Sequence, residues 1–300
     1  MNGKRLNVLV TGANGQLGRE IRRLAAPDGP HYLFSDVNRL PGEETLYLDI
    51  TDIDAVRLVC ESEQVDVIVN CAAYTDVERA ERDSAMADLL NHRAAANLAQ
   101  VAKERDAVLI HISTDYVFHG DRSEPYPEDW TTAPLGVYGA TKLLGEKAVT
   151  ESGCRYLIFR TAWLYSPYGK NFVKTMLQLT AERDSLSVVC DQIGTPTCAA
   201  DLAALIVDIV AGRRFSPQGI YHYTDEGVCS WYDFACAIRD IAGNRCDIRP
   251  CRSSEYPAKA ARPSYSVLDK TKVRRTFGVT IPHWHASLAA CMERIRSEKN

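Results

Sequence analysis

The feature that most constrains the fold of this chain is a glycine-rich turn close to its N-terminus. It reads Thr11-Gly12-Ala13-Asn14-Gly15-Gln16-Leu17-Gly18, follows the apolar run at residues 7–10 and opens a segment with helical spacing. Such glycines permit a tight turn and close approach of the backbone to a pyrophosphate, whose charge the free amides of a helix N-terminus bind. A strand, turn and helix in this order predict a dinucleotide-binding site that includes Gly12, Asn14, Gly15, Gln16, Leu17 and Gly18.

Short apolar runs alternate with longer amphipathic stretches through the first half of the chain. Strands are predicted at residues 7–10, 32–34, 46–48, 65–69 and 107–112. Between them, apolar residues recur at helical spacing, as at Leu17, Ile21 and Leu24 and again within residues 89–98. Nearly continuous apolar strands are typical of a parallel sheet buried on both faces, and strict alternation with helices indicates βαβ units. The predicted fold class is therefore α/β, a Rossmann-like doubly wound parallel sheet.

The pattern loosens in the second half of the chain. Helices are predicted at 171–183, 198–212, from Ser230 onward and at 284–296, strands at 186–190 and 219–223, and a proline-punctuated loop at 250–263. We predict that residues 1–165 form an NAD(P)-binding Rossmann domain that also includes part of 185–225. Residues 166–300 are predicted to form a smaller C-terminal α/β lobe that binds the substrate and lends the sheet a late strand.

The composition of the chain bears on its partners and on its location. The chain is 46% hydrophobic and 25% charged, with a net charge of −4, which gives no reason to expect nucleic acid or a membrane surface. The apolar run at residues 6–10 is too short for an export signal, and no stretch is long enough to span a bilayer. Ten cysteines occur without a CxxC pair or metal-ligand spacing. These features predict reduced thiols, no metal site and a cytoplasmic location.

Several polar and small residues follow the predicted strands, at the sheet edge where open α/β sheets bind ligands. Asp36 ends the second strand and is placed to bind the adenosine ribose hydroxyls, where its carboxylate would repel a 2′-phosphate and favour NADH. Arg39 could instead accept that phosphate, so the predicted cofactor is NADPH or NADH. Five further cofactor contacts are predicted after the third and fourth strands, at Asp49, Ile50, Cys71, Ala72 and Ala73.

Tyr138 and Lys142 lie four residues apart, a spacing that places both side chains on one face of a helix. A free tyrosine has a pKa near ~10, and a lysine cation close to the phenol is expected to lower it and ease proton exchange. Thr114 ends the fifth strand and can hydrogen-bond a carbonyl or alkoxide without titrating. The spacing alone is a weak signal, because many surface helices carry Tyr and Lys four apart, but together with the glycine turn it makes these three residues the candidates for catalysis.

In chain order, the glycine turn, Thr114, Tyr138 and Lys142 resemble the extended short-chain dehydrogenase/reductase superfamily. Longer stretches are similar to the dTDP-4-dehydrorhamnose reductases, namely residues 67–75, 111–118, 134–142, 159–165, 171–177, 191–197 and 261–263. The resemblance implies reduction of the 4-keto group of a dTDP-6-deoxy-hexulose by NAD(P)H, the last step in making dTDP-L-rhamnose. The implied partner is therefore this small molecule, and the chain is expected to be a monomer or homodimer.

The resemblance also implies roles for single residues. Tyr138 donates a proton to the alkoxide at C4, while Lys142 binds the nicotinamide ribose and stabilises the ionised tyrosine. Thr114, Asp115 and Trp163 bind the sugar. Asn171 and Arg262 bind the nucleotide diphosphate, although Arg262 could equally form a salt bridge between a loop and a helix, and Gln192 could be a turn residue.

Two departures from these reductases stand out. Some of them use glutamates for a magnesium-bridged dimer; Glu20 matches one, but Ala200 stands where another is expected and Asp201 does not obviously substitute. No metal site is therefore predicted. Residues 74–78 are also more acidic than the corresponding stretch of those reductases.

Rival functions differ in the residues that they need. A 4,6-dehydratase needs an acid–base pair of Asp and Glu, but Asp115 is followed by Tyr116, which disfavours dehydration. A 4-epimerase uses the same Tyr and Lys and stays open. A third alternative is a non-catalytic binding subunit, similar to the regulatory partner of methionine adenosyltransferase, and the presence of Tyr138 and Lys142 argues against it.

Overall fold

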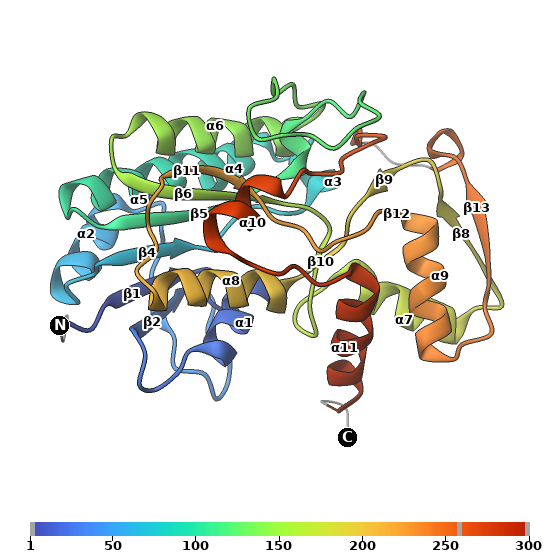
Figure 1. Ribbon diagram of the computed structural model, residues 1–300, viewed down its shortest axis with the longest axis horizontal. Helices are drawn as coiled ribbons and strands as arrows, with labels where there is room; N and C mark the ends of the chain where they lie inside the picture. The colour runs from blue at the N-terminus through green and yellow to red at the C-terminus, as the bar shows by residue number, and fades with distance from the viewer. Residues whose placement is uncertain (1–3, 257–259, 298–300) are drawn as a thin grey trace.

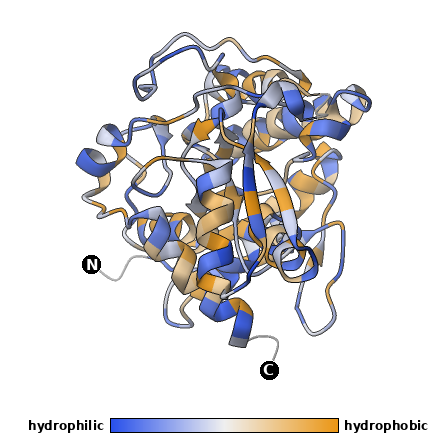
Figure 2. Ribbon diagram, turned by 90° about the vertical axis from the view of Figure 1, so that its right-hand side faces the viewer, coloured by the Kyte–Doolittle hydropathy of each residue, from blue (hydrophilic) through white to orange (hydrophobic). Residues whose placement is uncertain are grey.

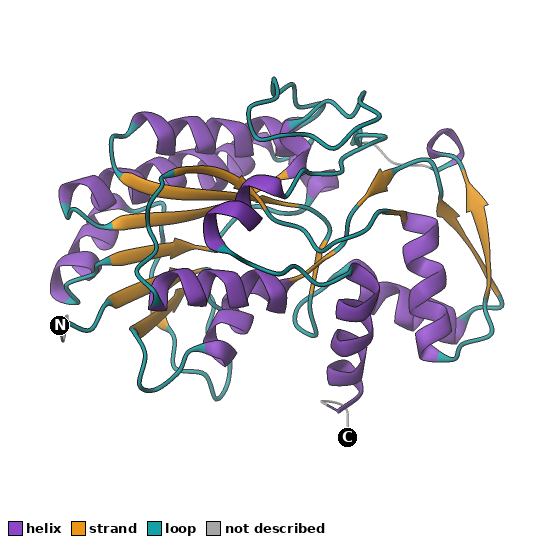
Figure 3. Ribbon diagram, in the orientation of Figure 1, coloured by secondary structure: helices purple, strands orange, loops and turns teal. Residues whose placement is uncertain are grey.

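A computed structural model describes residues 4–256 and 260–297. Its centre is a seven-stranded sheet in the order β11-β6-β5-β4-β1-β2-β3, in which every pair of neighbours is parallel (Figures 1 and 3). The strands are β1 (Asn7–Thr11), β2 (His31–Asp36), β3 (Leu46–Tyr47), β4 (Val67–Asn70), β5 (Val108–Thr114), β6 (Arg155–Thr161) and β11 (Gly219–His222). This order confirms the predicted doubly wound α/β fold.

Helices cover both faces of the sheet. On one face lie α1 (Gln16–Leu24), α8 (Ala199–Ala211) and α10 (Thr271–Phe277), and on the other α2 (Ile53–Ser62), α5 (Ala94–Glu104) and α6 (Val137–Glu151). Side chains alternate along β1, so that Val8 and Val10 pack with Ile21 of the first group while Leu9 packs with Val56 of the second. Burial on both faces explains why the strands read as nearly continuous apolar runs.

The direction in which successive strands are added to the sheet reverses at β1. The strands β2 and β3 lie on one side of β1, and β4 and the later strands lie on the other side. Val8 pairs with Tyr32 of β2 on one side and with Val67 of β4 on the other. At such a switch point the connections leave in opposite directions, which opens a crevice outside the carboxyl ends of the strands. The glycine turn after β1 lies at this crevice, as the sequence predicts.

Parts of the second half return to the sheet. β11 pairs with β6, with Ile220 opposite Ile158, and is the late strand that the sequence predicts. The helices α8 and α10 pack against the same sheet through Ile206 and Phe277. The division into domains at residue 165 stays a prediction, because the chain passes more than once between the sheet and the smaller lobe.

The smaller lobe lies beyond the carboxyl ends of the sheet strands (Figure 1). It contains α7 (Phe172–Glu182), β8 (Ser185–Val189), α9 (Trp231–Ala242), β13 (Asp247–Cys251), the short helix η3 (Ser253–Glu255) and α11 (Trp284–Ser297), together with short paired strands β7 (Leu164–Tyr165), β9 (Ile193–Gly194), β10 (Thr197–Cys198) and β12 (Cys229–Ser230). Figure 2 shows both hydrophobic and hydrophilic residues along its helices. The inward residues, among them Phe234, Ile238 and Leu288, form a separate core.

The predicted loop at residues 250–263 is partly wrong. Pro250 and Cys251 belong to β13, where they pair with Val188 and Val189 of β8. A proline is compatible with an edge strand, because such a strand has one row of amides that no neighbour needs. Residues 257–259 of the predicted loop lie outside the described residues. No helix within the described ranges has the length and apolar character needed to cross a membrane.

Asp225 is a buried carboxyl between the sheet and the smaller lobe, and it should make stability depend on pH. Its Oδ2 accepts a hydrogen bond from the Cys198 amide at 3.0 Å, and burial raises its pKa from 3.8 to about 9, with Asp201 adding to the rise. The folded protein therefore holds a proton between these pH values that the unfolded chain has lost, so stability falls as pH rises through this window.

Replacing Asp225 with Asn removes this proton linkage while keeping a similar shape. The free energy of unfolding should fall between about pH 6 and pH 8.5 in the wild type. In the variant this fall should be smaller by about 1–3 kcal/mol. Urea unfolding at both pH values measures the difference, with exposed Asp129→Asn as the control. Equal pH dependence in wild type and Asp225→Asn would contradict the raised pKa.

Candidate active site

A cleft of about 860 Å³ opens at the carboxyl ends of the sheet strands. Most residues predicted to bind cofactor or substrate line it: Gly12, Asn14, Gly15, Gln16, Leu17, Asp36, Asp49, Ile50, Cys71, Ala72, Ala73, Thr114, Asp115, Tyr138, Lys142, Trp163 and Asn171. Gly18 and Arg262 are not part of its lining. The structure thus brings together residues that are up to 159 positions apart, from Gly12 to Asn171.

The glycine turn is shaped by backbone contacts that exclude side chains. Gly12 has a φ of +63°, and a Cβ there would lie 2.5 Å from the amide nitrogen of Ala72. A Cβ on Gly18 would lie 2.5 Å from the Cα of Ala13, so this glycine packs the helix against the turn instead of facing the cleft. The exposed backbone of Gly12 and Gly15, at the start of α1, fits the pyrophosphate of a nicotinamide dinucleotide.

Asp36 ends β2 and faces the same end of the cleft. Its carboxylate accepts hydrogen bonds from the backbone amides of Asn14, at 3.1 Å, and Asn38, at 2.9 Å. These two bonds hold the carboxylate beside the glycine turn, and its binding of an adenosine ribose stays a prediction. Arg39 is not among the residues that line the cleft.

The predicted catalytic residues come from two neighbouring elements. Tyr138 and Lys142 lie in the first half of α6, and Thr114 is the last residue of β5. The Tyr138 phenol is hydrogen-bonded to Thr114, whose Oγ1 in turn donates to Asp115 Oδ1 at 3.0 Å. The buried Thr114 hydroxyl and the half-buried Tyr138 phenol therefore face one point in the cleft, where a carbonyl oxygen of a ligand could bind.

Burial controls the titration of Tyr138 and Lys142. Loss of solvation raises the pKa of Tyr138 to about 12, against the opposing effect of its hydrogen bond with Thr114. Burial also lowers the pKa of Lys142 to about 8, while the charge of Glu146 acts to raise it. The Lys142 ammonium donates to the Ile112 carbonyl at 2.5 Å. The predicted net lowering of the Tyr138 pKa is therefore wrong, because desolvation of the phenol dominates.

A raised pKa suits a tyrosine that donates a proton, since the phenol remains protonated until negative charge develops beside it. Asp115 adds a second titratable group, because burial raises its pKa to about 6 against the effect of hydrogen bonds from Ser266 and Thr114. The site thus holds a protonated phenol, a hydroxyl and a carboxyl that titrates near neutral pH.

Trp163 lies in an aromatic wall of the cleft. Its φ of +49° is unusual for a bulky residue, and its ring stacks on Trp231 with centroids 3.5 Å apart and planes 11° from parallel. On the other side, a Cβ at Gly194 would lie 2.8 Å from the indole. Strained backbone of this kind persists only where the surroundings enforce it, which is typical of binding sites.

Asn171 and Arg262 are held by other protein groups. Asn171 is the N-cap residue of α7. Its Oδ1 accepts a hydrogen bond from the Lys174 amide, and its Nδ2 donates to Gln16 Oε1 at 2.9 Å and to the Ser166 carbonyl at 2.8 Å. This amide links the glycine turn to the smaller lobe. Its binding of a diphosphate stays a prediction.

Arg262 forms the salt bridge between a loop and a helix that the sequence left as an alternative. Its Nη2 lies 2.9 Å from Glu78 Oε1 in the short helix α3 (Val77–Ala80), and its guanidinium is hydrogen-bonded to the Tyr116 phenol. Gln192 donates to Ser253 Oγ at 2.9 Å and does not line the cleft.

The Glu20 carboxylate forms ion pairs with two arginines. It is fully buried and lies 2.9 Å from Arg23 Nε and 2.8 Å from Arg294 Nη1. Within residues 4–256 and 260–297, no group of three or more His, Cys, Asp or Glu side chains is arranged to hold a metal ion.

Sequence reasoning missed several cleft residues, among them Thr75, Val77, Leu90, Thr161, Lys170 and Trp231. Trp231 opens α9, and no motif marks it as different from a core aromatic. Leu90 lies in a π-helical turn, η1 (Leu89–Arg93), which interrupts the predicted helix after α4 (Ser84–Asp88). Such turns are frequent at functional sites, but helical spacing in a sequence does not reveal them.

Comparisons with known proteins agree with this geometry. The family model described as "RmlD substrate binding domain" matches residues 6–297. A dTDP-4-dehydrorhamnose reductase of Aggregatibacter actinomycetemcomitans is 40% identical over 291 residues, covering 94% of this chain and 96% of that protein.

Two solved structures are similar over nearly the whole chain. A dTDP-4-dehydrorhamnose reductase of Clostridium acetobutylicum has a TM-score of 0.90 and 39% identity, covering 97% of this chain and 100% of that one. A dTDP-4-dehydrorhamnose reductase of Bacillus anthracis, solved in complex with NADP, has a TM-score of 0.89 and 38% identity, with coverage of 97% and 99%. The chain therefore belongs to the dTDP-4-dehydrorhamnose reductase family.

Proposed function

We propose that this protein reduces the 4-keto group of dTDP-6-deoxy-L-lyxo-4-hexulose to give dTDP-L-rhamnose. The observation that carries the proposal is the cleft that joins a dinucleotide-binding turn at Gly12 and Gly15 to the hydrogen-bonded Thr114 and Tyr138. When bound, the reduced nicotinamide supplies a hydride. The remaining chemistry is the supply of a proton to the oxygen that the hydride makes negative.

The residues divide this task between them. The Thr114 hydroxyl, which donates to Asp115 in this structure, turns to donate to the carbonyl oxygen of the bound sugar, and this hydrogen bond strengthens as negative charge develops on that oxygen. Tyr138 gives its phenolic proton to the same oxygen, since its raised pKa of about 12 keeps it protonated beforehand. Lys142 stabilises the phenolate that results, and it can do so as a cation because Glu146 opposes the lowering of its pKa.

The site also bears on the three alternative functions, which are a dehydratase, a 4-epimerase and a regulatory subunit. Dehydration needs a second carboxylate next to Asp115, where the structure has the Tyr116 phenol, hydrogen-bonded to Arg262. A 4-epimerase stays an alternative, because it would use Tyr138 and Lys142 in the same positions. A purely regulatory subunit would have no need of a proton donor, whereas the Tyr138 phenol lies beside Thr114 in the cleft and the buried Lys142 follows it on the same helix.

We further propose that the protein acts in the cytoplasm, as a monomer or a homodimer. All ten cysteines are free thiols, which suits a reducing compartment. The enzymes that it resembles act on nucleotide sugars, and such a substrate needs no membrane or nucleic acid partner.

A direct assay tests the proposed function. The protein is mixed with dTDP-6-deoxy-L-lyxo-4-hexulose and either NADH or NADPH, and the absorbance of the reduced nicotinamide is followed. Oxidation that depends on the sugar and yields dTDP-L-rhamnose is expected. Cofactor that stays bound and unconsumed while the sugar isomerises would favour the epimerase, and no reaction combined with binding of a partner enzyme would favour the regulatory subunit.

Asp36 should determine which cofactor is preferred. Its carboxylate, fixed by the amides of Asn14 and Asn38, would repel a 2′-phosphate, so we expect wild type to use NADH better than NADPH. Asp36→Ser should shift the ratio of kcat/KM values toward NADPH by about 10-fold or more, since removing one unfavourable charge contact is worth at least ~1.4 kcal/mol. Steady-state kinetics with both cofactors measure this ratio. An unchanged ratio would exclude Asp36 as the determinant.

A further inference from the structure

The helix that carries Tyr138 and Lys142 begins without a capping side chain of its own. Gly136 occupies the N-cap position of α6 and makes no side-chain hydrogen bond, and the first turn contains no acidic residue. The first amides of any helix lack partners within the helix and need acceptors from elsewhere. In α6 these amides belong to the turn that includes Tyr138, so their partners bear on where the phenol lies.

Glu81 supplies the missing acceptor from a distant part of the chain. Its Oε1 accepts a hydrogen bond from the Val137 amide at 2.8 Å, although the two residues are 56 positions apart. Val137 is the first residue of α6 and directly precedes Tyr138. A carboxylate at a helix N-terminus is also favoured by the helix dipole.

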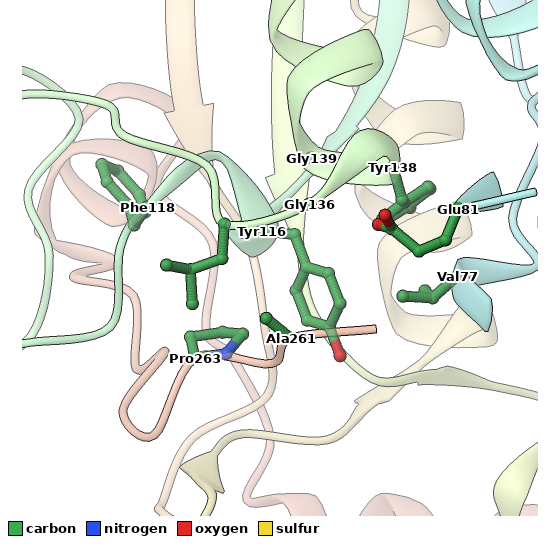
Figure 4. A pocket seen from close by; sticks show the side chains of 10 residues that line it. Val77, Glu81, Tyr116, Phe118, Gly136, Tyr138, Gly139, Ala261 and Pro263 are labelled. Atoms are coloured by element: carbon green, nitrogen blue, oxygen red, sulfur yellow. The ribbon is translucent and has the colours of Figure 1, made fainter. Parts of the chain in front are cut away.

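Figure 4 shows Glu81 beside Gly136 and Tyr138 at one side of a small pocket, with Tyr116 opposite. A Cβ on Gly136 would lie 2.6 Å from Glu81 Oε1, so the glycine leaves the space that the carboxylate occupies. A Cβ on Gly139 would lie 2.2 Å from the Tyr116 carbonyl oxygen. The first turn of α6 is thus fixed by backbone packing on one side and by the Glu81 carboxylate on the other.

Residues 74–78, the stretch that is more acidic than in the reductases that the chain resembles, hold Glu81 in place. Asp76 caps α3 by accepting from the Arg79 amide at 3.0 Å, and Glu78 in this helix pairs with Arg262. Glu81 follows directly as the C-cap residue of α3. Val77 of the same helix lines the cleft, so α3 connects the cleft wall to the start of α6.

We propose that Glu81 is a positioning residue for the proton donor. Its carboxylate caps α6 at Val137 and thereby holds the Tyr138 phenol at the distance and angle that proton transfer requires. Glu81 acts only through α6, so it should affect the proton-transfer step and not the affinity for cofactor. This inference rests on the proposed reduction, in which Tyr138 donates the proton.

The test compares variants that remove, keep or displace the carboxylate. Glu81→Ala should lower kcat about 10-fold, the effect of a small misplacement of a reacting group, with KM for the sugar and Kd for NADH changed less than about 2-fold. Glu81→Gln keeps an acceptor oxygen and should restore kcat to within about 3-fold of wild type. Gly136→Ala pushes the carboxylate away from Val137 and should lower kcat as well, which provides a second approach if Glu81→Ala does not fold.

A double variant shows whether Glu81 acts through Tyr138. In a Tyr138→Phe background, Glu81→Ala should cause no further loss of the residual rate, since the group that it positions is gone. The matched control is Asp52→Ala, which removes the cap of α2, where Asp52 accepts from the amides of Asp54 and Ala55. It should leave kcat unchanged, because α2 carries no catalytic residue.

Hydrogen exchange separates this inference from the proposed function. The Val137 amide should exchange faster in Glu81→Ala than in wild type or Asp52→Ala, whatever the substrate of the enzyme is. An inactive wild type with this exchange pattern would overturn the proposed reduction but keep the cap. Unchanged kcat in Glu81→Ala, an equal loss in Glu81→Gln, or a full further loss in the Tyr138→Phe background would overturn the positioning role.

Discussion

Replacing Tyr138 with phenylalanine is expected to lower kcat by about 10³-fold, within the range that general acid catalysis contributes. The substitution removes only the hydroxyl that donates the proton, and the ring keeps its edge contact with Tyr116, whose centroid lies 5.6 Å away. NADH and sugar binding should change little. The result is expected because the hydride can still reach the carbonyl carbon, but the oxygen that becomes negative no longer receives the proton of the Tyr138 phenol.

Tyr32→Phe is the matched control for this substitution. The Tyr32 hydroxyl is buried and has no hydrogen-bond partner among the described residues, but Tyr32 lies in β2 and does not line the cleft. It should retain full activity. If Tyr138→Phe kept more than about a tenth of wild-type kcat, Tyr138 would not be the general acid.

The second large effect concerns stability and the buried ion pair behind the catalytic residues. Glu146 lies one turn beyond Lys142 on α6. Its carboxylate accepts hydrogen bonds from Arg160 Nε, at 2.9 Å, and Arg160 Nη2, at 2.7 Å. Ser113 donates to the same carboxylate at 2.5 Å. Both charged side chains are almost fully buried, with exposed fractions of 2% for Glu146 and 3% for Arg160.

Glu146→Leu should lower the free energy of unfolding by about 3–5 kcal/mol, because it leaves the Arg160 guanidinium buried without its counter-charge. The double variant Glu146→Leu with Arg160→Met should recover much of this loss, since it removes both charges from the core. Denaturant unfolding of the three proteins at one pH measures both differences.

An exposed pair provides the comparison. Arg57 and Glu104 form a similar two-point contact at 2.9 and 3.0 Å, but both side chains reach solvent. Glu104→Leu should cost less than about 1 kcal/mol, as is usual for surface ion pairs. A cost for Glu146→Leu no greater than that for Glu104→Leu would mean that the buried pair does not hold β5, β6 and α6 together.

The sequence predicts those parts of the structure that depend on local patterns. The glycine turn needs only its own residues and the strand and helix beside it, and the spacing of Tyr138 and Lys142 needs only one helix. Burial of the sheet strands is visible as continuous apolar runs. These features allowed the fold to be predicted correctly, and most of the residues predicted to bind cofactor or substrate line the cleft.

Other features depend on contacts between distant segments, which the sequence does not display. β13 contains Pro250 and alternating polar residues and becomes a strand through its pairing with β8. Glu81 and Trp231 have no motif and gain their roles only from what the fold places beside them. The pKa of Tyr138 shows the same limit, because the spacing predicts a nearby lysine but not the depth of burial that outweighs it.

The central claim is that hydride goes to C4 of the sugar and that a proton from this chain completes the alcohol. The most direct measurement uses NADH carrying deuterium at the transferred position, with dTDP-6-deoxy-L-lyxo-4-hexulose as substrate. We expect dTDP-L-rhamnose with one deuterium at C4 and one NADH oxidised for each sugar formed. A sugar product that forms without net oxidation of NADH, or that carries no deuterium at C4, would contradict the account.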